Sequence, residues 1–238
     1  MTAQPSAAHP PTAHPPTALD PVVQESTPSI IARSLRRAIA SGDFPPGAQL
    51  GEAALAKQLG VSRGPLREAM QRLTQEGLLV SHRNRGLFVP ELTPDAVADM
   101  YVLRTTIERA AIERVLAAGD RLACADRLDA AVARMAALSE QADSTDMVAA
   151  DLDFHRALVE AAGSERLSRI HETVVVETSM CLRAMSSTYG PAEDRVTEHR
   201  ELADAIRAGE LVPAITALQA HMSDGLQRLT ATAATSPE

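Results

Sequence analysis

The sequence is poor in aromatic side chains and in lysine. Its 238 residues include no Trp, two Tyr and three Phe, so aliphatic side chains and methionine must fill any core. The single lysine is Lys57, in the N-terminal third of the chain. The C-terminal part therefore has no lysine that could form a Schiff base, which excludes a pyridoxal-phosphate enzyme there.

Cysteine and long apolar runs are also scarce. Cys124 and Cys181 are too few for a disulfide framework, and we interpret them as reduced core thiols. No stretch approaches the roughly 20 uninterrupted apolar residues of a membrane span. Residues 1–27 hold six prolines and no Lys or Arg, which predicts a disordered tail and not a secretory signal; a second short tail is expected at 233–238. We therefore expect a cytoplasmic protein with no membrane partner.

Residues 55–70 hold the most informative pattern in the chain. The sequence LAKQLGVSRGPLREAM predicts a short helix ending at Leu59, a tight turn at Gly60 and Val61, and a second helix capped by Ser62. Two helices joined by a turn of a few residues form the helix-turn-helix arrangement that reads DNA.

The second helix of this pair separates an apolar stripe from a basic row. Leu66, Met70 and Leu73 recur at the spacing of one buried face, and two arginines lie four residues apart on another face. Such a pair alone is more often a solvated surface, but the flanking segments also fit a DNA-binding domain. Because guanidinium groups make forked contacts with guanine edges and phosphates, the predicted DNA contacts of this helix are Arg63, Gly64, Arg67 and Gln71.

The following segment predicts a β-hairpin, or wing. The apolar runs 78–80 and 87–89 are suited to paired strands, and the polar residues 81–86 form the turn between them. Such a hairpin can place arginines on phosphates or in the minor groove, so the predicted wing contacts are Arg83 and Arg85, to which the family resemblance described below adds Gly86. Upstream, a first helix is predicted with the apolar stripe Ile30, Ile31, Leu35 and Ile39. Residues 28–90 are therefore predicted to be a winged helix-turn-helix domain.

This domain resembles the GntR family of bacterial transcription regulators. The likeness is carried by AIASGDFPPGAQL (38–50), residues 55–70, EGLL (76–79) and RGLFV (85–89), in the family's order and spacing. The resemblance implies DNA contacts at the recognition-helix arginines and around the wing. Some members have a further DNA-contacting arginine early in the helix before the turn, where this chain has Ala53 and Ala54.

Charge is divided in the same way as the motifs. Residues 28–90 hold 9 Lys+Arg against 4 Asp+Glu, whereas residues 91–238 hold 14 against 25. A basic module attached to an acidic body concentrates the attraction for phosphate at the helix-turn-helix.

The rest of the chain, 91–232, predicts an all-α bundle of about six helices. About 140 residues rich in Ala and Leu are enough for such a bundle to have its own core. The expected fold class is thus mainly α, an N-terminal winged helix-turn-helix with a small β-hairpin followed by a helical bundle. The expected helices are 94–118, 121–141, 144–163, 164–187, one ending at Gly209, and 212–230.

One carboxylate and three imidazoles on three of these helices could converge in the bundle interior and bind a divalent metal. They are Asp151 and His155, four residues apart on one helix face, with His199 and His221. A lone helical histidine is more often a surface or hydrogen-bonded core residue. On composition alone, His171 and His82 are equally possible metal ligands.

The bundle also resembles the FCD domain, the ligand-binding domain of the FadR subfamily of GntR regulators. The likeness is carried by DLDFHRALVEAAG (151–163), EHRELADAIRAGE (198–210) and His221, with LRTTIERAAIERVLAA (103–118) matching the opening helix. Many such domains hold a metal through one aspartate and three histidines, which correspond to the four residues above. Histidine-rich sites with one carboxylate accept several divalent ions, of which we expect zinc, with nickel or manganese as alternatives. The intact metal set argues against acyl-coenzyme A as ligand.

The same resemblance implies a small carboxylate effector. Arg104 is the family's position for an arginine that clamps the acid, and Arg183 is a weaker candidate. Arg104 could instead be ion-paired with Glu108 one turn on. The implied function is a homodimeric, ligand-responsive regulator on inverted-repeat operator DNA, and most relatives are repressors released by ligand.

Two other functions fit the same residues. In the first, the metal is purely structural and no small molecule regulates DNA binding, so removing the metal would unfold the bundle. In the second, a metal-dependent hydrolase is fused to the DNA-binding domain. No recognisable general base accompanies the proposed ligands, and hydrolysis assays on metal-loaded protein would test this alternative.

Overall fold

The computed structural model describes three stretches of the chain, residues 25–141, 144–184 and 192–233. The predicted tails 1–27 and 233–238 lie outside these stretches except for one to three residues each, and so does the predicted end of the fourth bundle helix near Ser187. Among the helices described, none is both long and apolar enough to cross a membrane.

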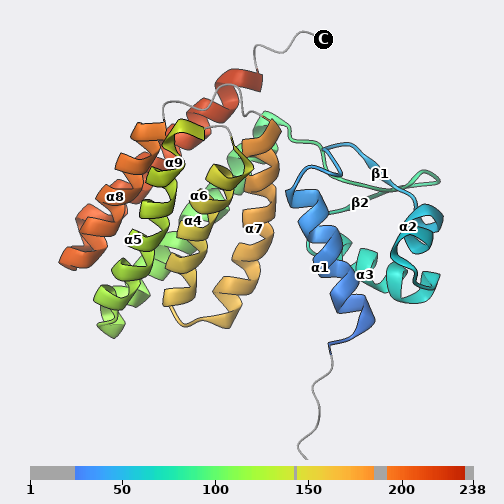
Figure 1. Ribbon diagram of the computed structural model, residues 1–238, viewed down its shortest axis with the longest axis horizontal. Coiled ribbons are helices and arrows are strands. Elements are labelled where there is room, and N and C mark those ends of the chain that lie inside the picture. The colour runs from blue at the N-terminus through green and yellow to red at the C-terminus, as the bar shows by residue number, and fades with distance from the viewer. Residues whose placement is uncertain (1–24, 142–143, 185–191, 234–238) are drawn as a thin grey trace, which may run out of the picture.

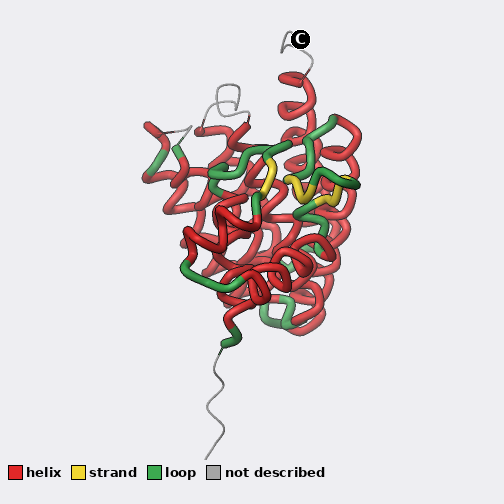
Figure 2. Tube along the Cα trace, turned by 90° about the vertical axis from the view of Figure 1, so that its right-hand side faces the viewer, coloured by secondary structure: helices red, strands yellow, loops and turns green. Residues whose placement is uncertain are grey.

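The N-terminal part is a winged helix-turn-helix, as predicted (Figure 1). A three-stranded antiparallel sheet in the order β1-β3-β2 accompanies three helices, and the strands occupy one small patch of a mainly helical molecule (Figure 2). The elements are α1 (Thr27–Ala40), β1 (Gln49–Leu50), α2 (Glu52–Leu59), α3 (Arg63–Gln75), β2 (Val80–His82) and β3 (Gly86–Phe88).

The turn between α2 and α3 has the predicted chemistry. Gly60 ends α2 in the left-handed region, with φ 64°, which glycine adopts without a steric penalty. Ser62 is extended at the N-cap of α3, although its side chain makes no capping hydrogen bond. Leu66, Met70 and Leu73 are fully buried, which confirms the predicted apolar stripe and leaves the basic face of α3 outside.

Two details of this part differ from the prediction. Ile30 is 47% exposed and Ala32 is buried in its place, because a 100° turn per residue puts position 32, not 30, on the face of Leu35 and Ile39. The strands are shifted to Val80–His82 and Gly86–Phe88, and β1 was not predicted. A two-residue strand lacks the alternation that identifies longer ones.

The C-terminal part is an α-helical bundle. Six α-helices are described there, which agrees with the predicted number, and a 3-10 turn, η1 (Ser139–Gln141), follows the second. In the packing, α4 contacts α6, α7 and α9, while α8 contacts α5 and α9 (Figure 1). The helices are α4 (Pro94–Ala118), α5 (Arg121–Ala137), α6 (Thr145–Ala161), α7 (Glu165–Ala184), α8 (Ala192–Ala208) and α9 (Leu211–Ala233).

Helix α7 belongs to both parts of the molecule. It packs on α4 and α6 within the bundle and on α1 of the winged helix-turn-helix (Figure 1). Its Val176 and Met180 are buried in the apolar core of the N-terminal part. The hydroxyl of Ser179 donates to the Ala40 carbonyl at 2.9 Å. A displacement of α7 would therefore move α1 directly, because the two helices are in contact.

Candidate metal centre and DNA-binding surface

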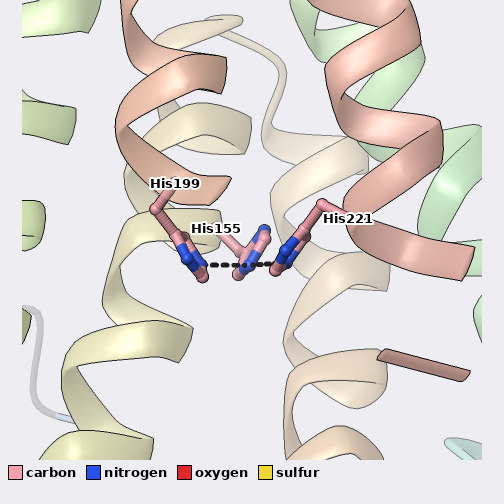
Figure 3. A group of neighbouring side chains, drawn as sticks. All are labelled: His155, His199 and His221. Carbon is pink, nitrogen blue, oxygen red and sulfur yellow. Dashed lines mark hydrogen bonds between the residues drawn. The ribbon is translucent and has the colours of Figure 1, made fainter. Parts of the chain in front are cut away.

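Three histidines from three helices converge in the interior of the bundle (Figure 3). Helix α6, capped by Ser144, supplies Asp151 and His155 from successive turns of its buried face. His199 comes from α8 and His221 from α9. The Nε2 atom of His155 lies 3.2 Å from that of His199 and 3.3 Å from that of His221. Asp151 Oδ1 lies 3.5 Å from His199 Nε2.

The second nitrogen of each ring is held by an acceptor. Carboxylates and carbonyls accept but do not donate, so each Nδ1 carries the proton and each Nε2 presents a lone pair. This arrangement, with Nδ1 bonded outward and Nε2 directed inward, is the one that histidine ligands of metals adopt. The acceptors for His155, His199 and His221 are Glu108 Oε2 at 2.7 Å, the Arg195 carbonyl at 2.7 Å and Glu198 Oε2 at 2.9 Å.

Burial keeps the imidazoles of His155 and His199 neutral. Desolvation, reinforced by Arg104, lowers the pKa of His155 to about 4, against the opposing pull of Glu108. Desolvation lowers the pKa of His199 to about 3. For Asp151, burial raises the pKa, but His199, His155 and Arg104 outweigh it and the net pKa is lowered. At neutral pH His155, His199 and Asp151 therefore have the protonation states that metal binding requires.

The residues fit a divalent cation. Lone pairs that face each other across 3.2–3.3 Å repel unless a cation lies between them. Two imidazole nitrogens each about 2.0–2.1 Å from one ion at a tetrahedral angle are about 3.3 Å apart. Asp151 Oδ1 is buried and has no hydrogen-bond partner among the described residues. A bound ion would remove both penalties.

A second layer of buried charge surrounds these four residues. Glu108, from α4, is completely buried; its Oε1 accepts from Arg104 Nε at 2.9 Å and lies 3.3 Å from His171 Nε2. Burial raises the pKa of Glu108, but His155 and Arg104 outweigh burial and hold it well below its usual range. The sequence allowed Arg104 either to bind the acid or to pair with Glu108, and the ion pair with Glu108 is present. The Nη2 atom of Arg104 is nevertheless buried with no partner in the described residues.

The other candidates raised from composition lie elsewhere. His171 is in the second layer, and His82 packs edge-on against Phe88 in the wing at 5.0 Å. Arg183, in the last turn of α7, has a buried Nε with no hydrogen-bond partner in the described part of the chain.

Sequence reasoning missed the groups that orient the histidines. Glu108 was considered only as a partner for Arg104. Glu198 precedes His199 directly, yet it bonds His221 on another helix and also accepts from Arg228 at 2.7 Å. Spacing along one helix does not reveal such a cross-helix bond, although a buried carboxylate beside a ligand helix is a reason to look for one.

On α3, all four predicted DNA contacts are exposed. Arg63 is the first residue of the helix, and a Cβ added at Gly64 would meet nothing within 4 Å. Arg67 and Gln71 continue the same face. The Nε of Arg67 donates to Glu52 Oε2, at the start of α2, at 2.6 Å.

The wing contacts are exposed as well, but Gly86 has a structural reason to be glycine. Its φ is 95°, and an added Cβ would lie 3.4 Å from Gln49 Nε2. That amide donates to the Arg85 carbonyl at 2.5 Å, so β1 holds the wing in place. The Arg85 guanidinium lies 5.4 Å from the centre of the Phe88 ring, and Arg83 is exposed nearby.

Comparison with known proteins identifies both domains. The family described as "Bacterial regulatory proteins, gntR family" matches residues 29–89, and the FCD domain matches residues 99–224. The chain belongs to the GntR family of bacterial regulators. Its second domain is an FCD domain, and the histidine centre lies within it.

Relatives of this GntR regulator extend over most of its length. It is 33% identical over 185 residues to the Probable D-xylose utilization operon transcriptional repressor of Paenarthrobacter nicotinovorans, covering 78% of this chain and 80% of the relative. A crystal structure described as that of a GntR transcriptional regulator from Rhodococcus sp. RHA1 is 27% identical, with a TM-score of 0.70 over 86% of this chain and 97% of that chain. Escherichia coli McbR/YncC, 21% identical, shares the fold with a TM-score of 0.76 over 88% and 100%. These relatives support a DNA-binding transcriptional regulator and not an enzyme.

Proposed function

We propose that this GntR regulator is a ligand-responsive repressor whose FCD domain holds a divalent metal and binds a small organic acid. The metal ligands are Asp151, His155, His199 and His221, and zinc is the expected ion, with nickel or manganese as the alternatives. The observation that carries the proposal is the convergence of three Nε2 lone pairs whose Nδ1 protons are all bonded outward. A bound ion supplies positive charge and open coordination positions for an anionic oxygen.

The charge of the surrounding residues favours an anionic effector. Asp151, Glu108 and Arg104 are buried beside the histidines and together carry one net negative charge. A divalent ion leaves one positive charge uncompensated, and a buried uncompensated charge is costly. A carboxylate would neutralise it. The Nη2 of Arg104, which has no partner among the described residues, is an available donor for the same ligand.

A route from this centre to the DNA-binding domain runs through α7. His171 on α7 contacts Glu108, which in turn bonds His155. Five and nine residues further along the same helix, Val176 and Met180 are buried against the winged helix-turn-helix. Rearrangement around Glu108 on effector binding would shift α7 and hence α1. Effector and operator affinities are then coupled reciprocally, typically by about 1–3 kcal/mol.

DNA binding is assigned to a homodimer. Two copies of α3 enter successive major grooves of an inverted repeat, with contacts at Arg63, Gly64, Arg67 and Gln71, and the two wings contact the flanking backbone through Arg83, Arg85 and Gly86. An effector that changes the spacing of the two α3 helices would release the operator.

The test is a thermal-shift screen of the full chain, loaded with zinc, against small hydroxy, sugar and aromatic acids, repeated after chelation. A ligand that binds only the folded state must raise the melting temperature. An acid that raises it only in the zinc-loaded protein is the expected result. If chelation lowers the melting temperature and no acid raises it, the metal is purely structural. Failure to retain zinc, nickel or manganese would overturn the assignment of the ligands.

The sign of regulation is a separate measurement. Fluorescence anisotropy with an operator duplex, in the presence of the acid found in the screen, should show weaker binding for a repressor. Stronger binding would contradict the repressor assignment while leaving the metal and effector assignments in place.

A further inference from the structure

The central arginine of the recognition helix already has a partner. Arg67 Nε donates to Glu52 Oε2 at 2.6 Å, and the two side chains are 63% and 36% exposed. Glu52 is the first residue of α2, fifteen residues earlier in the chain, so the contact crosses the helix-turn-helix. Arg67 lies on the surface that the proposed function assigns to DNA, and Glu52 contacts it there.

The geometry of this contact leaves the reading edge of Arg67 open. A guanidinium has five N–H groups, and Nε carries one of them. With Nε held by Glu52, the four N–H groups on the two terminal nitrogens remain available. Those groups form the fork that contacts O6 and N7 of guanine. The bond therefore restricts the rotation of the long side chain without occupying the atoms that read a base.

We propose that Glu52 is a positioning residue that orients Arg67 toward one base pair and thereby sets the base preference of the regulator at that position. The inference rests on the proposed assignment of α3 as the DNA-reading helix. A carboxylate on a phosphate-binding surface weakens sequence-independent attraction. Glu52 thus lowers binding to every sequence and raises discrimination between sequences.

A second ion pair on the same helix provides a matched control. Arg72 donates to Glu68 at 2.6 Å, one turn apart, and these side chains are also partly exposed, at 41% and 54%. Arg72 donates in addition to Ser29 Oγ of α1 at 3.0 Å, so its guanidinium is directed toward the domain and not toward a base. Removing Glu68 should change charge on α3 without changing base preference.

The experiment uses the full chain and a duplex that the unaltered protein selects from a randomised pool. Affinities are measured by anisotropy for this duplex, for each single base-pair change and for an unrelated duplex. The base pair read by Arg67 is the position at which Arg67→Ala loses discrimination. There, Glu52→Ala should lose about tenfold in discrimination and bind the unrelated duplex more tightly. Glu52→Gln keeps an oxygen acceptor for Arg67 and should retain most of the discrimination.

Two controls make the result specific. Glu68→Ala should leave discrimination at every position unchanged, and Glu52→Ala should have no further effect on discrimination when Arg67 is already alanine. Equal tightening of all duplexes by Glu52→Ala, with discrimination unchanged, would show that Glu52 is only a repulsive charge and would overturn the inference alone. If Arg67→Ala itself changes no discrimination, both this inference and the assignment of α3 are wrong.

Discussion

The two functional regions of this regulator treat charge in opposite ways. The residues of α3 and the wing that we assign to DNA are all exposed, and those of their charges that are paired, such as Arg67 with Glu52, are paired at the surface. At the histidine centre, Asp151, Glu108 and Arg104 are almost completely buried, and each depends on its neighbours. A solvated charge tolerates the loss of a partner, whereas a buried charge left without one costs several kcal/mol. Substitutions should therefore lower DNA affinity moderately at the surface and lower metal affinity strongly in the centre.

The sharpest test of this contrast is His199→Ala. Removing one imidazole leaves an incomplete ligand set around a buried carboxylate, so we expect metal affinity to fall by at least about 100-fold. The response to any acid should disappear with the metal. Metal content is measured by mass spectrometry after gel filtration, and His82→Ala, in the wing, is the control that should retain the ion. Full metal occupancy in His199→Ala would mean that the ligand set is wrong.

On the exposed side, Arg67→Ala should lower affinity for the selected operator by about tenfold per half-site, within the roughly 1–3 kcal/mol expected of a base contact. The helix and the bundle should remain folded, because the side chain is 63% exposed. The control is Arg109→Ala, which removes a similarly exposed, ion-paired arginine from α4. Anisotropy titrations at several salt concentrations measure affinity and salt dependence together. The assignment fails if both match the unaltered protein.

A smaller effect is expected from Glu198→Gln. The amide oxygen can still accept from His221 Nδ1, but the charge that pairs with Arg228 is lost. Loss of such an outer partner weakens metal binding by about tenfold, the low end for this kind of change. Competition with a fluorescent zinc chelator measures the affinity. Glu201→Gln changes an exposed carboxylate of the same helix and should have no effect; equal affinities for both variants would show that Glu198 does not support the centre.

The same contrast explains how much the sequence could predict. The exposure of the residues that we assign to DNA follows from their position, because Gly60, Ser62 and the row from Arg63 to Gln71 have a fixed order along the chain. The strand β1 could not be predicted, since its two residues are ordered only by pairing with β3. It nevertheless holds the wing through Gln49.

At the buried centre, spacing predicted which residues could be ligands but not what orients them. Asp151 and His155 share a helix face, so their proximity is local and predictable. Glu108 and Glu198 bond histidines on other helices, 47 and 23 residues away in sequence. Those bonds depend on how the helices cross, and helix periodicity carries no information about crossing.

A last prediction concerns Glu177, whose charge lies between the two regions and is neither fully solvated nor paired in the described residues. It lines a pocket between α7 and the start of α4, where burial and then Asp99 raise its pKa above the ordinary value of 4.5. Because the folded protein holds the proton of this carboxyl more tightly than the unfolded chain does, the free energy of unfolding falls as pH rises through the raised pKa. Glu177→Gln should therefore raise the melting temperature at pH 7 by about 1–3 °C.

The gain should vanish near pH 4, where Glu177 is protonated in the folded protein and the substitution changes little. Glu172→Gln is the control on the same helix, because Glu172 is paired with Arg156 at 3.3 Å and should not gain stability when neutralised. Differential scanning calorimetry of the three proteins at both pH values measures the difference. If the melting temperature of Glu177→Gln is still raised at pH 4, packing and not charge limits stability where α7 meets the DNA-binding domain. Helix α7 would then couple the two regions through packing contacts alone.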